Sequence, residues 1–176
     1  KDQSQHLEMT RDVASRFHAQ MGETFVIPEL KLHEETMYIP GTDGAKMSKS
    51  KGNTIIIFQS DKALKKQIMS IETDSTPLED PKDPDTCNVF GIYKLLASKD
   101  EVAQMRKNYE AGGYGYGHAK KALYELVLNT FEKERALYNH YMENLDELDA
   151  ALSVGAEKAR GIANDVLERV RKKVGY

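Results

Sequence analysis

The chain has 176 residues, of which 40% are hydrophobic and 30% are charged, and these proportions fit a folded domain and exclude a disordered chain. Its longest uninterrupted apolar run, residues 55–58, is far too short to cross a membrane. A single cysteine, Cys87, excludes an internal disulfide and a multi-cysteine metal cage, and it fits a reducing compartment. The net charge of −3 argues against non-specific coating of nucleic acid but allows local basic contacts.

The first third of the sequence predicts one helix and several short β-type runs. Apolar residues recur at three- and four-residue spacing over residues 2–21, which predicts an amphipathic helix that Gly22 ends. The inner stripe of this helix is formed by Leu7, Val13, Ala14, Phe17 and Met21. Residues 24–28 and 36–39 are short β-type runs, and the β-branched run 54–58 predicts a buried strand. No initiator methionine precedes the first helix, so we expect the sequence to be a piece of a longer protein.

The rest of the sequence predicts helices. Ser60 is suited to cap a helix that ends near residue 71, with Leu64 and Ile68 on its inner face. Residues 72–85 hold three of the five prolines and six acidic residues against one lysine, which predicts a solvated connector. Helical periodicity returns in four further segments, which are residues 88–97, 99–109, 118–144 and 155–174. The fold class is therefore mainly α, with a small parallel β remnant in the first sixty residues.

A glycine- and tyrosine-rich segment at residues 109–117 must contain a turn, because four of its glycines lie within six positions. Its tyrosines have two interpretations. They are suited to stack on single-stranded bases, or to pack the turn between two helices.

A lysine- and serine-rich loop at residues 46–50 is the strongest chemical signal. It lies among Gly41, Gly44 and Gly52, and Lys51 adds a third positive charge to those of the loop's two lysines. Serine hydroxyls and free backbone N–H groups in such a loop suit phosphate oxygens, and a lysine there can stabilise charge that develops on a departing phosphate. The alternative interpretation is a solvated lysine loop that has no binding or catalytic function.

The sequences of this loop and of several other segments resemble those of a known family. Residues 46–50 read KMSKS, which is the second signature of class I aminoacyl-tRNA synthetases. Residues 2–12, DQSQHLEMTRD, resemble the DQ-x-QH-x-E-x-TRD segment of tryptophanyl-tRNA synthetases. Further landmarks of that family follow in the same order, at residues 73–75, 88–97, 109–117 and 155–159. The sequence is thus similar to the C-terminal half of a tryptophanyl-tRNA synthetase.

The resemblance implies a domain organisation. Residues 1–58 correspond to the C-terminal part of a Rossmann-like catalytic domain, and residues 59–154 to an α-helical anticodon-binding domain. Residues 155–176 correspond to a terminal helix that packs back toward the catalytic domain. Because this last segment has six basic residues against three acidic ones, contacts with tRNA phosphates and an ordinary solvated face are alternatives to the packing role.

The resemblance also implies site residues. Lys46 and Lys49 are the expected catalytic residues, which bind the ATP phosphates and stabilise the transition state. The other residues expected to bind ATP are Lys1, Asp2, Ile39, Met47, Ser48 and Ser50. Gln3 is expected to face the amino acid substrate, although Asp2 and Gln3 are also suited to cap the first helix. No residue is expected to bind a metal directly, and ATP is expected as a substrate with Mg²⁺.

The implied parent protein is a cytoplasmic, homodimeric ligase of protein biosynthesis with tRNA(Trp), tryptophan and ATP as partners and no membrane. The piece alone is expected to be inactive, because an H-x-G-H type signature is absent from it. Two alternatives stay open. One is the sister tyrosyl-tRNA synthetase, and the other is a catalytically silent helical RNA-binding or adaptor module of synthetase ancestry.

Overall fold

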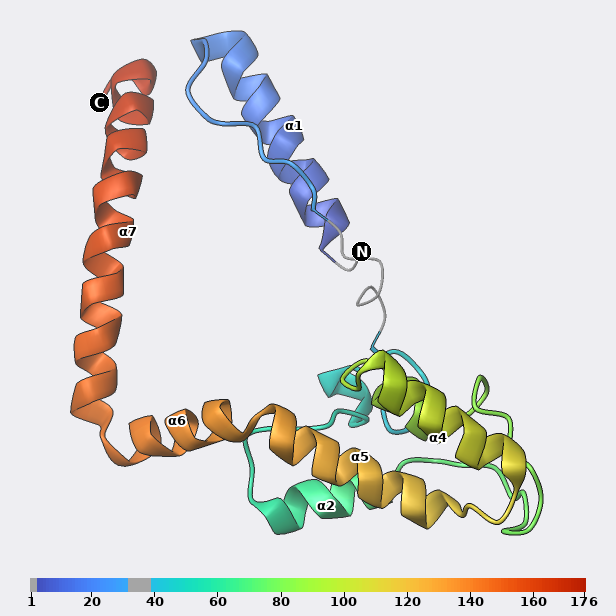
Figure 1. Cartoon of the computed structure of the whole chain (residues 1–176). Helices are drawn as coiled ribbons and strands as arrows, with labels where there is room; N and C mark the ends of the chain where they lie inside the picture. Colours follow the sequence, from blue (N-terminus) through green and yellow to red (C-terminus); the bar gives the residue numbers. More distant parts are fainter. Residues whose placement is uncertain (1–2, 32–38) are drawn as a thin grey trace. The chain divides into compact units, whose positions relative to one another are not determined.

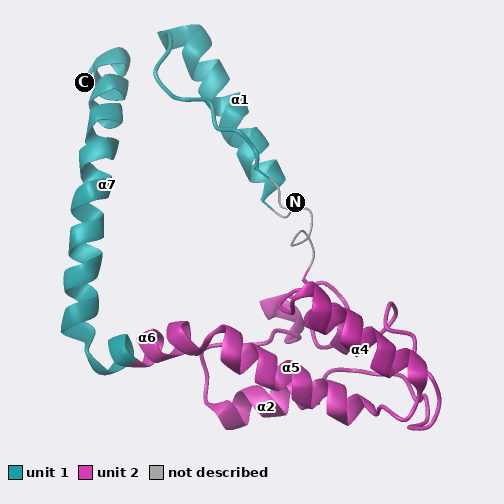
Figure 2. Ribbon diagram, viewed as in Figure 1, with its two compact units in different colours: residues 1–37, 140–176 teal, residues 38–139 magenta. Residues whose placement is uncertain are grey.

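The structure, a computed structural model, describes residues 3–31 and 39–176, and within these ranges the regular structure is helical (Figure 1). The elements are α1 (Ser4–Met21), the 3-10 turn η2 (Lys49–Lys51), α2 (Asp61–Met69), α3 (Asn88–Tyr93), α4 (Lys99–Ala111), α5 (Tyr116–Thr130), α6 (Glu132–Glu143) and α7 (Leu145–Val174). Figure 2 shows the two compact units, which comprise residues 1–37 with 140–176 and residues 38–139. None of the described helices is both long enough and apolar enough to span a bilayer.

The hydrophobic core lies in the unit of residues 38–139, where α2 and α3 pack against α5. Leu64 and Ile68 are fully buried, as their spacing predicted, and so is Leu123 of α5. Ser60 caps α2 as predicted, because its Oγ accepts a hydrogen bond from the Ala63 N–H at 3.3 Å. The mainly helical class and this inner face are therefore confirmed.

Helix α4 begins and ends on signals that the sequence carries. Ser98 and Glu101 form a reciprocal capping box, in which the Ser98 N–H donates to the Glu101 carboxylate at 2.8 Å. Gly112 ends the helix with φ +74°, and a Cβ on this residue would lie 2.4 Å from the Glu79 carbonyl oxygen. Only glycine combines this backbone conformation with so close an approach. The predicted helix over residues 99–109 is confirmed, with two further residues at its C-terminal end.

The predicted β remnant is wrong for the described residues, which contain no strand and only an isolated antiparallel bridge between Pro40 and Lys46. Residues 54–56 are irregular and a bend follows, and Ile56 is 49% exposed. The Gln67 side chain takes the place of a partner strand, because its amide donates to the Thr54 carbonyl (3.1 Å) and accepts from the Ile56 N–H (3.0 Å). The run 24–28 likewise forms no strand, and residues 36–38 of the other run lie outside the described residues.

The segment 72–85 is an irregular, mostly exposed loop, as its composition predicted, but one charged side chain within it is buried. Lys82 is only 4% exposed, and its ammonium group donates to the carbonyl oxygens of Pro77 (2.8 Å), Leu78 (3.2 Å) and Asp80 (3.0 Å). The same ammonium lies 5.5 Å from the centroid of the Tyr116 ring, an arrangement that attracts a cation to the ring face. A buried lysine therefore organises the segment from within.

The tyrosines of residues 109–117 serve packing. Tyr109 is 1% exposed, and its ring centroid lies 5.7 Å from that of Phe90 and 5.9 Å from that of Tyr114. Burial raises the pKa of Tyr109 well above its usual range. Cys87 lies directly before α3, is buried and contacts the Tyr109 hydroxyl at 3.4 Å.

Three predicted helices have other bounds in the structure, and the first of them, predicted over residues 88–97, ends four residues early at Tyr93. The predicted helix 118–144 is interrupted at Phe131 (φ −108°, ψ 20°), which separates α5 from α6. Apolar periodicity missed this break because the backbone bonds continue across it, with the Arg135 N–H bonded to the Phe131 carbonyl at 2.9 Å. Helix α7 begins ten residues earlier than predicted and includes Gly155, whose cost of about 1 kcal/mol does not end a helix of 30 residues.

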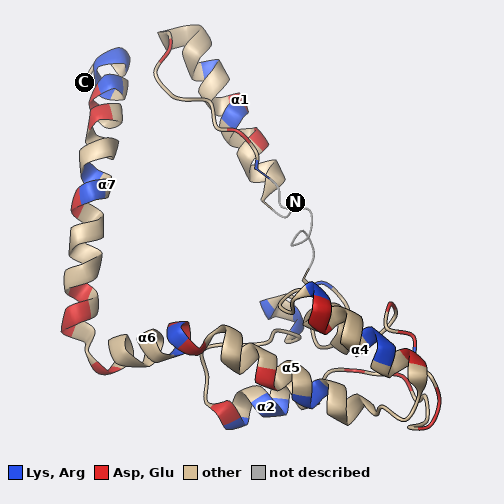
Figure 3. Cartoon of the chain, in the orientation of Figure 1, with Lys and Arg blue, Asp and Glu red and all other residues tan. Residues whose placement is uncertain are grey.

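The unit of residues 1–37 and 140–176 contains α1 and α7. Two α7 side chains donate to backbone carbonyls just after α1, Arg169 to Thr24 at 3.3 Å and Lys173 to Glu23 at 2.7 Å. Figure 3 shows the basic residues in the last turn of α7 and the acidic ones in its first turn, the distribution that favours a helix dipole. These hydrogen bonds support a packing role for the terminal helix, whereas the three domain ranges stay a prediction.

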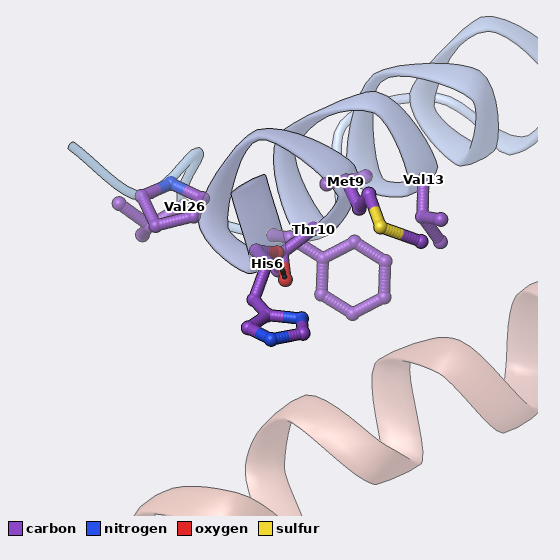
Figure 4. Close-up of a pocket in the computed structure, with 8 residues that line it drawn as sticks. His6, Met9, Thr10, Val13 and Val26 are labelled. Carbon is purple, nitrogen blue, oxygen red and sulfur yellow. Dashed lines mark hydrogen bonds between the residues drawn. The ribbon is translucent and has the colours of Figure 1, made fainter. Parts of the chain in front are cut away.

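The predicted inner stripe of α1 is partly covered among the described residues, with Leu7 and Phe17 half-buried and Val13 and Met21 exposed. Only Ala14 is buried, and Val13 is 67% exposed. Side chains of α1 and of residues 25–28 line a mainly apolar hollow of about 560 Å³ (Figure 4). The helix, which begins at Ser4, and its end at Gly22 are confirmed.

Candidate functional site

Backbone hydrogen bonds close the turn that precedes the lysine- and serine-rich loop. The Gly41 N–H donates to the Ala45 carbonyl (2.7 Å), and the Met47 N–H donates to the Ile39 carbonyl (3.0 Å). Ile39 is thereby hydrogen-bonded to the loop, and its role toward ATP stays a prediction. Gly44 has φ +74°, a conformation that lets the chain reverse before Lys46.

Asn53 holds the loop together from its interior. The side chain is 3% exposed, and its amide nitrogen donates to the Asp43 carboxylate (2.7 Å) and to the Lys46 carbonyl (3.2 Å). Its amide oxygen accepts from the Ser48 N–H at 2.8 Å. One buried side chain thus fixes both ends of the Lys46–Ser48 segment.

The charged side chains of the loop face solvent. Lys46, Lys49 and Lys51 are exposed, and the latter two lie in the turn η2. The hydroxyl groups of Ser48 and Ser50 contact each other at 2.8 Å. Three ammonium groups on a short, internally braced loop form a positive surface that suits a polyanion such as a chain of phosphates.

Asp43 is the acidic residue of this loop. The Asn53 amide donates to its carboxylate, which lowers the pKa of Asp43 below its ordinary value, and Lys51 adds a smaller electrostatic contribution in the same direction. Asp43 also accepts from the Ala45 N–H at 3.0 Å. Its charge therefore braces the turn that precedes Lys46.

The structure brings together part of the predicted site. Ile39 and residues 46–50 lie on one loop of the unit 38–139. Gln3 lies in the other unit at the N-cap position of α1, where its carbonyl accepts from the Leu7 N–H at 3.2 Å, and its role toward the substrate stays a prediction. Lys1 and Asp2 lie outside the described residues.

Sequence reasoning missed the residues that shape the loop. A Cβ on Gly41 would lie 2.4 Å from the Asn53 side chain and 2.7 Å from the Asn53 carbonyl oxygen, so residue 41 must be glycine for Asn53 to reach its partners. Both residues flank the lysine loop, but nothing in their spacing indicates that one packs on the other.

Asn53→Ala is expected to lower the free energy of unfolding of the chain by about 1–2 kcal/mol, because it removes a buried side chain with three hydrogen bonds. Hydrogen exchange of the Ser48 amide is expected to accelerate, whereas the Met47 amide, which bonds to Ile39, keeps its protection. An unchanged Ser48 exchange rate would contradict the bracing role. The matched control is Asn108→Ala, since Asn108 pairs with Gln104 at the surface of α4.

No group of three or more His, Cys, Asp or Glu side chains is arranged to hold a metal ion in the part of the chain that the structure describes. The described loop does not fit Mg²⁺ either, because its one carboxylate, Asp43, is already hydrogen-bonded to Asn53 and Ala45 and its other charged residues are lysines.

Comparison with known proteins was consistent across sequence and structure. The sequence profile of the family "tRNA synthetases class I (W and Y)" matches residues 1–132. The tryptophan–tRNA ligase of Campylobacter jejuni strain RM1221 is 49% identical over 175 residues, which are 99% of this chain and 55% of that protein. The corresponding ligase of Rhodopirellula baltica is 45% identical over 174 residues, which are 99% of this chain and 54% of the length of that ligase.

A crystal structure of C. jejuni tryptophanyl-tRNA synthetase complexed with ADP and tryptophan superposes with a TM-score of 0.87 at 48% identity, over 100% of this chain and 55% of that chain. The chain therefore spans about half the length of the relatives it matches. The profile match over most of its length, together with the KMSKS loop, shows that the chain belongs to the class I tRNA synthetases of the tryptophan and tyrosine family.

Proposed function

We propose that the full-length protein is a tryptophan–tRNA ligase that forms tryptophanyl-adenylate from tryptophan and ATP and then transfers the amino acid to tRNA(Trp). The observation that carries this proposal is the braced loop with exposed Lys46 and Lys49, in a chain 49% identical to a tryptophan–tRNA ligase over 99% of its length. The relatives that name tryptophan favour it over tyrosine as the substrate.

The chemistry assigned to the loop is electrostatic. The carboxylate of the amino acid attacks the α-phosphorus of ATP, the bond to the bridging oxygen breaks, and pyrophosphate leaves with the negative charge. The ammonium groups of Lys46 and Lys49 bind the phosphates and stabilise the charge that develops on the leaving group. Met47, Ser48, Ser50 and the backbone at Ile39 complete the contacts with ATP, and Lys1, Asp2 and Gln3 contribute at the ribose and amino acid sides.

Mg²⁺ belongs in this proposal with ATP rather than with the loop. The lysine-rich loop has no free carboxylate cluster for it among the described residues, and phosphate oxygens are the ligands that Mg²⁺ accepts in nucleotide sites. When bound, the ion neutralises phosphate charge alongside the lysines.

The helical region is assigned to tRNA. We place the anticodon-binding domain in residues 59–154, between the catalytic portion 1–58 and the terminal segment 155–176. The full-length protein is proposed to be a cytoplasmic homodimer, as expected from the family resemblance.

Tryptophan-dependent exchange of pyrophosphate into ATP tests this proposal. The full-length protein is expected to catalyse exchange with tryptophan and not with tyrosine, whereas the 176-residue chain alone is expected to show none, because it spans about half the length of its relatives. Exchange with tyrosine would favour the sister enzyme, and no exchange with either amino acid would favour the adaptor. Activity of the chain alone would refute the assignment of essential machinery to the rest of the protein.

A further inference from the structure

Outside the KMSKS loop, the first residue of α3 contacts the turn from which the loop extends. Asn88 lies so close to Gly44 that a Cβ on this glycine would be 2.3 Å from the Asn88 Oδ1 atom and 2.9 Å from its Nδ2 atom. Gly44 is two residues before Lys46. The Asn88 amide therefore packs directly against the backbone of this turn.

The same side chain begins a chain of hydrogen bonds that reaches the turn. The Asn88 Nδ2 atom donates to the Glu72 carbonyl at 3.0 Å, and the Glu72 N–H donates to the Thr42 carbonyl at 2.8 Å. The Thr42 N–H donates in turn to the Asn53 carbonyl at 2.9 Å. The turn 41–44 is thus held between Asn53 on one side and the Glu72–Asn88 pair on the other.

Asn88 lies next to residues of the hydrophobic core. Ile71, next to Glu72, and both Val89 and Phe90, which follow Asn88, are 1% exposed. Contacts made by Asn88 therefore connect the lysine loop to the hydrophobic core, whose side chains have few alternative positions. Catalysis by positioned charges tolerates displacements of only about 0.5 Å, so an anchor of this kind bears on the rate.

We propose that Asn88 is a positioning residue for the KMSKS loop: through Gly44 and the Glu72–Thr42 hydrogen bond it sets the resting position of Lys46 and Lys49. The proposal deepens the proposed function, on which its catalytic readout depends. Asn88 does not contact the reacting atoms. An amide is required because it must donate to the Glu72 carbonyl while fitting against a glycine.

The first experiment needs no catalysis. Trypsin cleaves after lysine, and Lys46, Lys49 and Lys51 are exposed, so the cleavage rate within residues 46–51 reports how firmly the loop is held. In the full-length protein, Asn88→Ala is expected to raise this rate about three- to tenfold, the factor that one lost hydrogen bond implies, without raising cleavage elsewhere. Asn108→Ala is the matched control, and it is expected to leave the loop cleavage at the wild-type rate.

Asn88→Asp separates positioning from folding. Aspartate has the same shape and its charge is favourable in the first turn of a helix, which offsets part of the lost hydrogen bond, so the melting temperature is expected to fall less than in Asn88→Ala. Its carboxylate cannot donate to the Glu72 carbonyl at 3.0 Å, so loop cleavage is still expected to rise. A merely structural role predicts instead that loop cleavage follows the melting temperature, and so rises less in Asn88→Asp than in Asn88→Ala.

The kinetic readout is the rate of tryptophan-dependent pyrophosphate exchange. Both variants are expected to lower kcat about three- to tenfold with KM for tryptophan unchanged, because the amino acid is bound elsewhere. Unchanged loop cleavage and unchanged kcat in both variants, or cleavage that rises equally at all sites, would overturn the inference. If the wild-type protein lacked exchange activity, the proposed function would fail, whereas the trypsin assay would still test the anchor.

Discussion

Lys49→Ala in the full-length protein is expected to lower kcat for tryptophan-dependent pyrophosphate exchange by about 10²–10³-fold, the effect of removing one preorganised donor from a developing anion. The Lys49 side chain is exposed in the turn η2, so its removal is not expected to disturb the packing of the fold. The melting temperature is therefore expected to be unchanged, so that the loss is one of transition-state stabilisation.

Lys51→Ala is the matched control for this experiment. Lys51 carries the same charge in the same turn, but it follows the KMSKS motif and lies near Asp43 rather than at a position assigned to the phosphates. Its removal is expected to reduce exchange far less than removal of Lys49. Equal losses in the two variants would mean that the loop acts through its net charge alone.

Lys82→Met is expected to lower the free energy of unfolding of the chain by about 1.5–3 kcal/mol, the usual effect of losing hydrogen bonds to a charged donor, with part of the cost offset because a buried charge is removed. Three carbonyl oxygens share the Lys82 ammonium. Urea denaturation followed by far-ultraviolet circular dichroism measures the change.

Lys94→Met provides the comparison, since Lys94 is exposed at the C-terminal end of α3 and surface substitutions usually change stability by less than about 0.5 kcal/mol. Equal denaturation midpoints for the two methionine variants would show that the segment 72–85 is held by other contacts. A loss confined to Lys82→Met would identify its ammonium as the organising group.

The parts of the fold that the sequence predicted well are those with local signals. Ser60 caps α2 as its position indicates, and the inner face of α2 follows from the spacing of Leu64 and Ile68. The KMSKS loop could likewise be found from five consecutive residues. Each of these features depends on residues that are neighbours in the chain.

The features that sequence reasoning missed depend on distant partners. A β-branched run forms a strand only beside another strand, and residues 54–56 instead meet the Gln67 side chain. The burial of Lys82 is invisible in a segment rich in proline and acid, because three carbonyls from the same segment solvate it. Asn53 and Asn88 act on the loop through contacts that no motif records.

Two basic side chains of α7 donate hydrogen bonds to the chain that follows α1, and this limits how the length of α7 can change. Arg169 and Lys173 are four residues apart and reach the carbonyls of Thr24 and Glu23, so both project from one side of α7. Inserting or deleting a single residue upstream within α7 would turn the pair by about 100° and shift it by about 1.5 Å relative to the start of the helix. We therefore expect substitutions along α7 to be tolerated more readily than changes in its length, because both side chains reach their carbonyls only at one length and one rotation of the helix.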